Sequence, residues 1–165
     1  MTDMEPRWLD AQERAAWLAL LSVTTLLPGA IEAPLQHAAK LSLFEYNVLA
    51  MLSEADGDAL PMSELAARTT ASLSRLSHVV KKLQARGLVQ RSIHAVDARV
   101  TEAAITGEGM ALIEGLAPAH VLTVRELIFD QLDRDDVENL ARIGRKLVRG
   151  LDGEHWTLRP DRPDA

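Results

Sequence analysis

The sequence contains no cysteine. A disulfide framework, a zinc site with thiolate ligands, a thiol nucleophile and a cysteine redox sensor are therefore excluded. The five histidines include no pair at a spacing of three or four residues, so they do not indicate a metal site. The chain also has no glycine-rich dinucleotide motif, no phosphate-binding loop and no zinc-protease motif. The sequence predicts neither an enzyme nor a protein with a metal or cofactor.

Long hydrophobic runs are also scarce. The longest uncharged run, residues 15–31, has 17 residues, whereas a membrane-spanning helix needs roughly 20. The first 13 residues carry four acidic residues and one arginine, unlike the basic start of a signal peptide. Hydrophobic residues nevertheless make up 47% of the 165, which is enough for a folded core. We expect a cytoplasmic protein that does not bind membranes.

The charge of the chain is unevenly distributed. The formal net charge of −6 argues against a nucleic-acid partner. Residues 61–100, however, contain seven Lys or Arg and two acidic residues, a local net charge of +5, while the rest of the chain carries −11. A basic centre between acidic flanks is typical of a nucleic-acid-binding module within a larger scaffold. Chance clustering of charge on a solvated face is the alternative.

The N-terminal part predicts a helix over residues 10–27 that is apolar on nearly every side. Such a helix must be buried on every side, and a second subunit would bury it. The apolar stripe of the last predicted helix would serve the same dimer, and a monomeric helical core is the alternative. Pro28-Gly29 should stop or kink the first helix, and Pro34 should restart or bend the chain after it. The stripe consists of Val137, Leu140, Ile143, Leu147 and Leu151.

Capping and turn residues divide the remaining chain. Ser42 followed by Glu45 is a capping-box pattern that opens a helix, and Asp56–Asp58 is a turn. We expect Ser63, Ser72 and Thr106 to cap further helices. The predicted elements are helices over 43–55, 64–69, 73–86, 107–130 (kinked at Pro118) and 133–149, a hairpin of strands 88–91 and 100–105, and a loosely ordered tail.

The predicted helix over 73–86 has two distinct faces. Leu73, Leu76, Val79, Val80 and Leu83 follow helical spacing and predict one buried face. Polar and basic residues occupy the opposite face and its edges. They are Ser74, Ser77, His78 and Lys81 on the face, with Arg75 and Lys82 at its edge.

Two helices joined by a three-residue turn and followed by a hairpin form a winged helix-turn-helix. Residues 62–66 (MSELA), residues 82–89 (KLQARGLV), and Asp97-Ala98-Arg99 followed by residues 105–109 (ITGEG) occur in this order. Together with the long flanking helices they resemble the MarR family of bacterial transcriptional regulators over roughly residues 10–150. The chain departs from the family at Val100, where many relatives have a second arginine, and at Pro28-Gly29, which interrupts a first helix usually kept longer.

The resemblance implies a mainly α-helical fold with a small β-hairpin wing, in which N- and C-terminal dimerisation helices flank the winged helix-turn-helix. It implies a homodimer whose recognition helices lie about one DNA turn apart, roughly 34 Å, on a pseudo-palindromic operator. We expect a repressor; the alternative is a winged-helix protein-interaction module without specific DNA binding. The implied parts are an N-terminal helical segment (10–40), a DNA-binding domain (41–106), dimerisation helices (107–151) and a tail (152–165).

In this interpretation double-stranded DNA is the partner, and the helix over 73–86 enters its major groove. Its first residues would contact base edges, Lys81 and Lys82 would meet phosphates, and Arg99 would reach the minor groove or brace the hairpin with Asp97. A solvated polar helix face is the alternative, as is a solvated loop position for His94. The expected DNA-binding residues are Ser72, Ser74, Arg75, Ser77, His78, Lys81, Lys82, Arg91, His94 and Arg99.

Many members of the MarR family also bind a small amphipathic aromatic or lipophilic effector between the dimer helices and the DNA-binding lobe. Binding shifts the spacing of the lobes because the ligand prefers one arrangement. Apolar walls with a few polar groups suit such a ligand, although the same residues also suit a plain core. The candidate effector-binding residues are Trp17, Leu21, Thr24, His37 and Tyr46.

Overall fold

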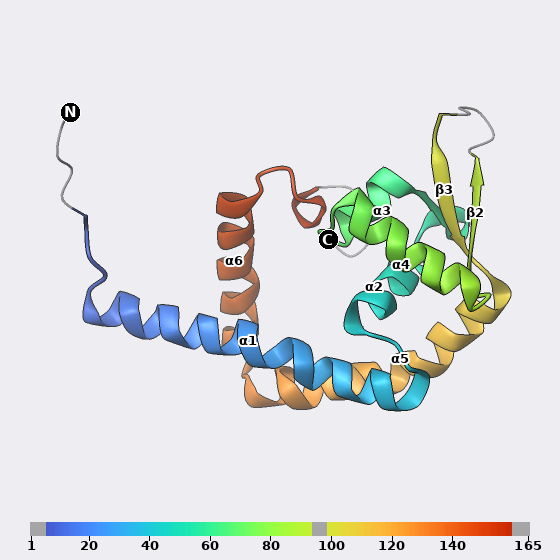
Figure 1. The fold of residues 1–165 in the computed structure, drawn as a ribbon. Helices are drawn as coiled ribbons and strands as arrows, with labels where there is room; N and C mark the ends of the chain where they lie inside the picture. Colours follow the sequence, from blue (N-terminus) through green and yellow to red (C-terminus); the bar gives the residue numbers. More distant parts are fainter. Residues whose placement is uncertain (1–5, 94–98, 160–165) are drawn as a thin grey trace.

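A computed structural model describes residues 6–93 and 99–159 (Figure 1). Two parts are visible: a lobe that carries the sheet, and a set of long helices that extend away from it. The fold is mainly helical with a small winged sheet, as predicted. The elements are α1 (Ala11–Ala39), α2 (Leu43–Ser53), η1 (Asp56–Asp58), β1 (Ala59–Pro61), α3 (Met62–Arg68), α4 (Leu73–Ala85), β2 (Val89–Ile93), β3 (Thr101–Ile105), α5 (Gly107–Leu127), η2 (Phe129–Gln131), α6 (Arg134–Leu151) and η3 (Trp156–Leu158).

The sheet has three antiparallel strands in the order β1-β3-β2. Ala103 at the centre of β3 pairs with Leu60 on one side and with Arg91 on the other. The sequence predicted only the β2–β3 hairpin. β1 was missed because it has three residues and ends in Pro61, and such a strand is tolerated only at an edge where one backbone donor is not needed.

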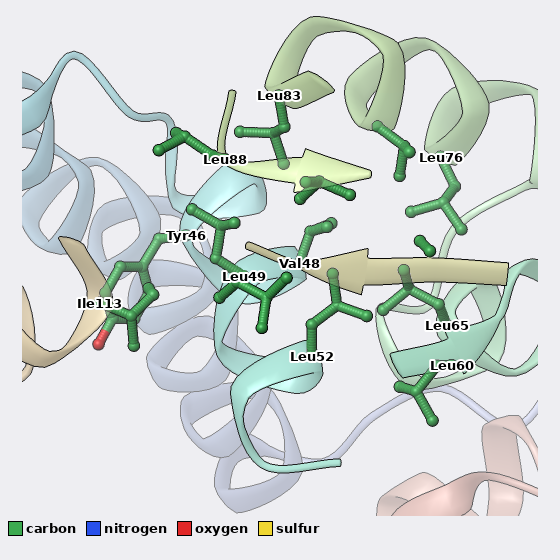
Figure 2. Close-up of a cluster of buried hydrophobic side chains, with 14 of the residues drawn as sticks. Tyr46, Val48, Leu49, Leu52, Leu60, Leu65, Leu76, Leu83, Leu88 and Ile113 are labelled. Carbon is green, nitrogen blue, oxygen red and sulfur yellow. The ribbon is translucent and has the colours of Figure 1, made fainter. Parts of the chain in front are cut away.

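A single hydrophobic core holds the lobe together (Figure 2). Figure 2 shows side chains of α2 facing those of α3, α4 and the strands. The predicted inner face of α4 is confirmed for Leu76, Val80 and Leu83, which are fully buried, and Val79 is half-buried. Leu73 is 55% exposed, so its predicted burial is wrong. It occupies the first position of α4, beyond the contact with α2 and the sheet.

The predicted caps are confirmed in three of four places. Ser42 and Glu45 form the capping box of α2, and the hydroxyls of Ser72 and Thr106 accept backbone N–H bonds at the starts of α4 and α5. The expected cap at Ser63 is wrong. β1 runs directly into α3, so Pro61 occupies the cap position, and no side chain caps that end.

The first helix is not interrupted at Pro28-Gly29. α1 runs for 29 residues and contains both Pro28 and Pro34, so the predicted stop is wrong. Each proline removes one backbone hydrogen bond. The helix continues past both prolines, and both of its ends are capped. Asp10 and Glu13 form a capping box, and Lys40 closes the helix in the left-handed conformation with φ 54°. α5 likewise continues through Pro118.

Residues 152–159 return to the sheet-bearing lobe, and Figure 1 shows this segment beside α3. His155 Nε2 lies 3.2 Å from Thr70 Oγ1, and Arg159 Nη1 donates to Glu64 Oε1 at 2.8 Å. Trp156 is half-buried. The loosely ordered tail predicted for residues 152–165 is therefore wrong for 152–159, because polar side chains anchor this segment. Residues 160–165 lie outside the described part of the chain.

The long helices leave much of their apolar surface uncovered. In α1 only Leu35 is buried, and in α6 no residue is. By length and composition α1 could also cross a membrane. The exposed apolar surface is not limited to α1, however, because it extends to the end of α5 and to α6. The large exposed residues are Trp17, Leu18, Leu20, Leu21, Val23 and Leu26 in α1, Val121, Leu122 and Leu127 in α5, and Leu140, Ile143, Leu147 and Leu151 in α6.

Gly109, in the first turn of α5, is predicted to tolerate no side chain. A Cβ at this position would overlap the backbone oxygen of Leu88 and lie 2.7 Å from Cγ1 of Ile105. We expect Gly109→Ala to lower the free energy of unfolding by about 2 kcal/mol or more, because α5 would have to move off the sheet. Urea denaturation followed by circular dichroism measures this change.

Gly115→Ala is the matched control, since a Cβ there meets nothing within 4 Å. Alanine is the better helix former, so this variant should gain about 0.5–1 kcal/mol. Equal effects of the two substitutions would contradict the close approach at Gly109.

Candidate nucleic-acid interface

α3 and α4 form a helix-turn-helix around the turn Thr69–Ala71. Thr70 adopts a left-handed φ of 51°, and Ser72 Oγ then accepts the backbone N–H of Arg75 at 3.2 Å. With one side of α4 in the core, the opposite side faces outward. Figure 1 shows the β2–β3 hairpin projecting beside this helix. Ser74, His78 and Lys81 are exposed, and Ser77 is half-buried.

Arg75 is exposed, but its guanidinium is not extended freely into solvent. The carbon at its centre lies 4.2 Å from the centroid of the Phe44 ring. This cation–π contact orients the side chain along the start of α4. The planar group keeps donors that could bind a guanine edge, so the predicted base contact stays a prediction.

Lys82 has an intramolecular partner. Its Nζ lies 2.6 Å from Oε1 of Glu45, a residue that is only 2% exposed. The other carboxylate oxygen of Glu45 accepts the backbone N–H of Ser42 at 2.8 Å. Burial by itself raises the pKa of Glu45, but the ion pair with Lys82 and the hydrogen bonds with Ser42 outweigh it and hold the pKa below its ordinary value. The predicted phosphate contact of Lys82 stays a prediction and competes with this ion pair.

Of the four predicted functional residues in the wing, the structure describes two, Arg91 and Arg99. Arg91 in β2 is exposed, and Arg99, at the beginning of the segment that leads into β3, is exposed as well. Because adjacent residues of a strand point to opposite faces, Arg91 and Val89 share one face and Gln90 the other. His94 and Asp97, which were predicted as a phosphate contact and a hairpin brace, lie outside the described residues.

The comparisons with known proteins agree with this geometry. A model of the MarR family matches residues 40–100. The structure of Sco3205, a MarR family transcriptional regulator from Streptomyces coelicolor in complex with DNA, is 35% identical, with a TM-score of 0.87 over 91% of this chain and 94% of that chain. AbsC from the same organism is also a MarR family regulator and is 35% identical, with a TM-score of 0.86 over 90% of this chain and 100% of that chain. The chain belongs to the MarR family of transcriptional regulators.

Two curated relatives are HTH-type transcriptional regulators. The transcriptional regulator MhqR of Bacillus subtilis is 30% identical over 112 residues, which are 66% of this chain and 75% of that protein. PrsX of Escherichia coli is 29% identical over 107 residues, and the match spans 65% of this chain and 64% of that relative's length.

The five residues predicted to line a MarR-type effector site do not surround one cavity within a single chain. Trp17 and His37 stand 20 positions apart on α1, which corresponds to about 30 Å along a helix. Trp17, Leu21, Thr24 and His37 are exposed on α1, whereas Tyr46 is buried in α2. The Tyr46 ring lies 4.3 Å from the ring of His120 in α5, and burial lowers the pKa of His120.

An apolar groove lies elsewhere, where α1 crosses the end of α5 and α6. Its volume is about 580 Å³, and Val23, Leu26, Leu127, Leu132 and Leu140 are among its lining residues. Sequence reasoning missed it because the groove depends on how α5 and α6 turn back toward α1. Among residues 6–93 and 99–159 no group of three or more His, Asp or Glu could hold a metal ion.

Sequence reasoning also missed the hydrogen bonds that Glu64 of α3 accepts from two arginines. Glu64 in α3 accepts hydrogen bonds from Arg68 at 2.9 Å and from Arg159 at 2.8 Å. The bond from Arg68 is the main cause that holds the pKa of Glu64 below its ordinary value. Arg68 was counted with the basic segment, and its four-residue spacing from Glu64 was the available signal for this pair.

Lys82→Met is predicted to destabilise the fold in a pH-dependent way, because it leaves the buried Glu45 carboxylate without its cation. Lys82 is half-exposed, so the expected loss near pH 7 is about 1–2 kcal/mol rather than the value for a fully buried pair. The depressed pKa of Glu45 means that the stabilisation is present above the ordinary value of 4.5 and is lost as the pH falls through the folded-state pKa. The difference between variant and wild type should therefore shrink below that pH.

Thermal or urea unfolding over a pH series measures the effect. Lys81→Met is the control, because Lys81 is exposed and pairs with no acid among the described residues; it should change stability by less than about 0.5 kcal/mol at any pH. A deficit of Lys82→Met that stays constant into acid would show that Glu45 is not its origin.

Proposed function

We propose that this MarR family member is a homodimeric, sequence-specific DNA-binding repressor. The observation that carries the proposal is the outward polar face of α4 beside the wing, in a chain 35% identical over 91% of its length to a regulator whose structure contains DNA. In such folds the second helix of the helix-turn-helix enters the major groove. The groove, about 12 Å wide, accommodates one α-helix with its side chains.

Different positions on the surface suit different contacts. Ser74 and His78 are exposed in the first half of α4, and Arg75 lies beside them, so we assign base-edge contacts to these three. Lys81 is exposed about two turns beyond Ser74 and suits a phosphate. Ser72 caps the helix, whose free backbone N–H groups attract a phosphate. We assign phosphate contact to Arg91 and minor-groove contact to Arg99 on the wing.

The exposed apolar surface supports a dimer. α1, the end of α5 and α6 all present large apolar side chains to solvent, and soluble proteins rarely leave contiguous surfaces of this kind uncovered. A second copy covers all three elements at once, whereas a membrane would account for α1 alone. A two-fold dimer places two recognition helices on one face of the duplex. We therefore propose a pseudo-palindromic operator and a cytoplasmic location.

Control by a small effector is part of the proposal. The groove of about 580 Å³ beside α1 lies within the apolar surface assigned to the dimer, so an effector there would be held between α1 and the second copy. Its volume falls in the range of small-molecule sites, and its apolar lining suits an aromatic or lipophilic molecule. A ligand there would act only if it favoured one spacing of the lobes over the other. Repression is the simplest consequence of a dimer that covers its operator and is released by a ligand.

A winged-helix protein-interaction module without specific DNA binding is the second candidate. The acidic overall charge of −6 favours it. Salt-dependent binding to a duplex separates the two candidates, since contacts with several phosphates make affinity fall steeply with salt.

Two substitutions on α4 should have different effects on DNA binding. Arg75→Ala should lose about 1–3 kcal/mol on a duplex selected by the wild-type protein from a random pool, and little on a scrambled duplex, because it removes a base contact. Lys81→Ala should weaken both duplexes alike and reduce the slope of log affinity against log salt by about 0.9, because it removes a phosphate contact. Fluorescence anisotropy at several salt concentrations measures both quantities. An equal loss on both duplexes for both variants would overturn these roles.

The dimer should depend on the apolar stripe of α6. Ile143→Glu introduces a charge at the centre of that stripe, where Ile143 is 46% exposed in the single chain, and should yield monomers or aggregates because a buried unpaired charge is costly. Size-exclusion chromatography with light scattering gives the mass directly. Arg142→Glu, next to it on the polar side, is the control and should remain dimeric. A wild-type chain that is monomeric at micromolar concentration would contradict the dimer.

A further inference from the structure

Arg86 joins the end of α4 to the end of α1. Its Nη2 donates to the carbonyl oxygen of Ala39 at 2.9 Å, and its Nη1 donates to that of Lys40 at 3.2 Å. The carbonyl of Ala39 is the last of α1, has no partner within the helix and lies at the negative end of its dipole, and the carbonyl of Lys40 belongs to the C-cap residue. One guanidinium therefore bonds both carbonyls at once.

Two other basic side chains of α4 face the same junction. Lys82 pairs with Glu45 in the first turn of α2, and Arg75 lies over the ring of Phe44 in that turn. Residues 39–45 thus receive three cationic groups from α4 and its C-cap. These contacts connect the recognition helix to the segment between α1 and α2. They also engage three basic side chains of the positively charged segment 61–100 within the protein.

The place of Arg86 on α4 separates it from the DNA-reading residues. It is the C-cap of the helix, about four turns beyond Ser72 at the N-cap. Because the N-terminal residues of a recognition helix contact base edges, Arg86 lies at the end remote from them. Both of its terminal nitrogens already donate to protein carbonyls.

We propose that Arg86 is a positioning residue for DNA recognition, acting by fixing the C-terminal end of α4 to the C-terminal end of α1. This inference rests on the proposed DNA-binding function and identifies how the DNA-reading helix is set relative to the dimerisation helix. A rotation or shift of α1 is transmitted to α4 through the two hydrogen bonds, so the spacing of the two recognition helices depends on a residue that does not touch DNA.

Two variants of Arg86 separate positioning from a phosphate contact. Lysine keeps the charge but lacks the planar fork that reaches two carbonyls, and glutamine loses both. If Arg86 positions α4, both Arg86→Lys and Arg86→Gln should lose roughly fivefold or more in affinity for the selected duplex. The salt slope should stay at the wild-type value, and binding to a scrambled duplex, which tolerates a displaced helix, should change less. Arg145→Gln on the polar side of α6 is the charge-matched control and should bind as wild type.

Hydrogen exchange without DNA provides the second measurement. Loss of the two bonds should speed exchange of the backbone amides at the end of α1 and in the last turn of α4 in Arg86→Gln, while the rest of the core stays protected. Circular dichroism confirms that the variants are folded.

Each result decides the inference. Wild-type affinity in Arg86→Lys together with a salt slope reduced by about 0.9 in Arg86→Gln would overturn it in favour of a phosphate contact. Unchanged exchange at both helix ends in Arg86→Gln would overturn it as well. If the wild-type protein binds no DNA, the proposed function fails, and the exchange experiment alone still upholds or overturns the connection between α1 and α4.

Discussion

The buried carboxylate of Glu45 constrains the arrangement of the helices around it. One oxygen caps the start of α2 by accepting the N–H of Ser42, and the other pairs with Lys82. A buried charge without both kinds of partner would cost several kcal/mol, so α2 and α4 can pack only in the register that brings them together. The residues on either side of Glu45 add to this junction: the Phe44 ring contacts Arg75, also of α4, and the Tyr46 ring lies against His120 of α5.

Apolar residues have two roles in this chain. In the sheet-bearing lobe they form a closed core, with the side chains of Leu49, Leu65 and Leu76 completely removed from solvent. In α1 and α6 similar residues form continuous stripes that the chain itself leaves open. The first set packs the lobe as a unit, and the second remains exposed in the single chain. The chain therefore combines one lobe with a closed core and a set of long helices whose apolar stripes are exposed.

The sequence predicted most of the fold but less of the site. Caps at Ser42, Ser72 and Thr106 and the buried face of α4 were predictable because they follow local spacing. The continuity of α1 was not predictable, since the effect of a proline depends on the stability that the rest of the helix gains from its other hydrogen bonds and its caps. The partners of Arg75, Lys82 and Arg86 were not predictable either. Those contacts join residues 31 to 47 positions apart, and a single sequence carries no direct signal for such pairs.

The docking of residues 152–159 has a mechanical consequence. His155 meets Thr70 just before α4 begins, while the guanidinium of Arg86 is bonded at the opposite end of that helix. Contacts at both ends of α4 oppose its swinging, and the buried Leu76, Val80 and Leu83 oppose its turning about its own axis. Movement of the long helices would then displace α4 together with the rest of the sheet-bearing lobe as one body. The outward side chains of the helix would keep their arrangement relative to one another, and only their position would change.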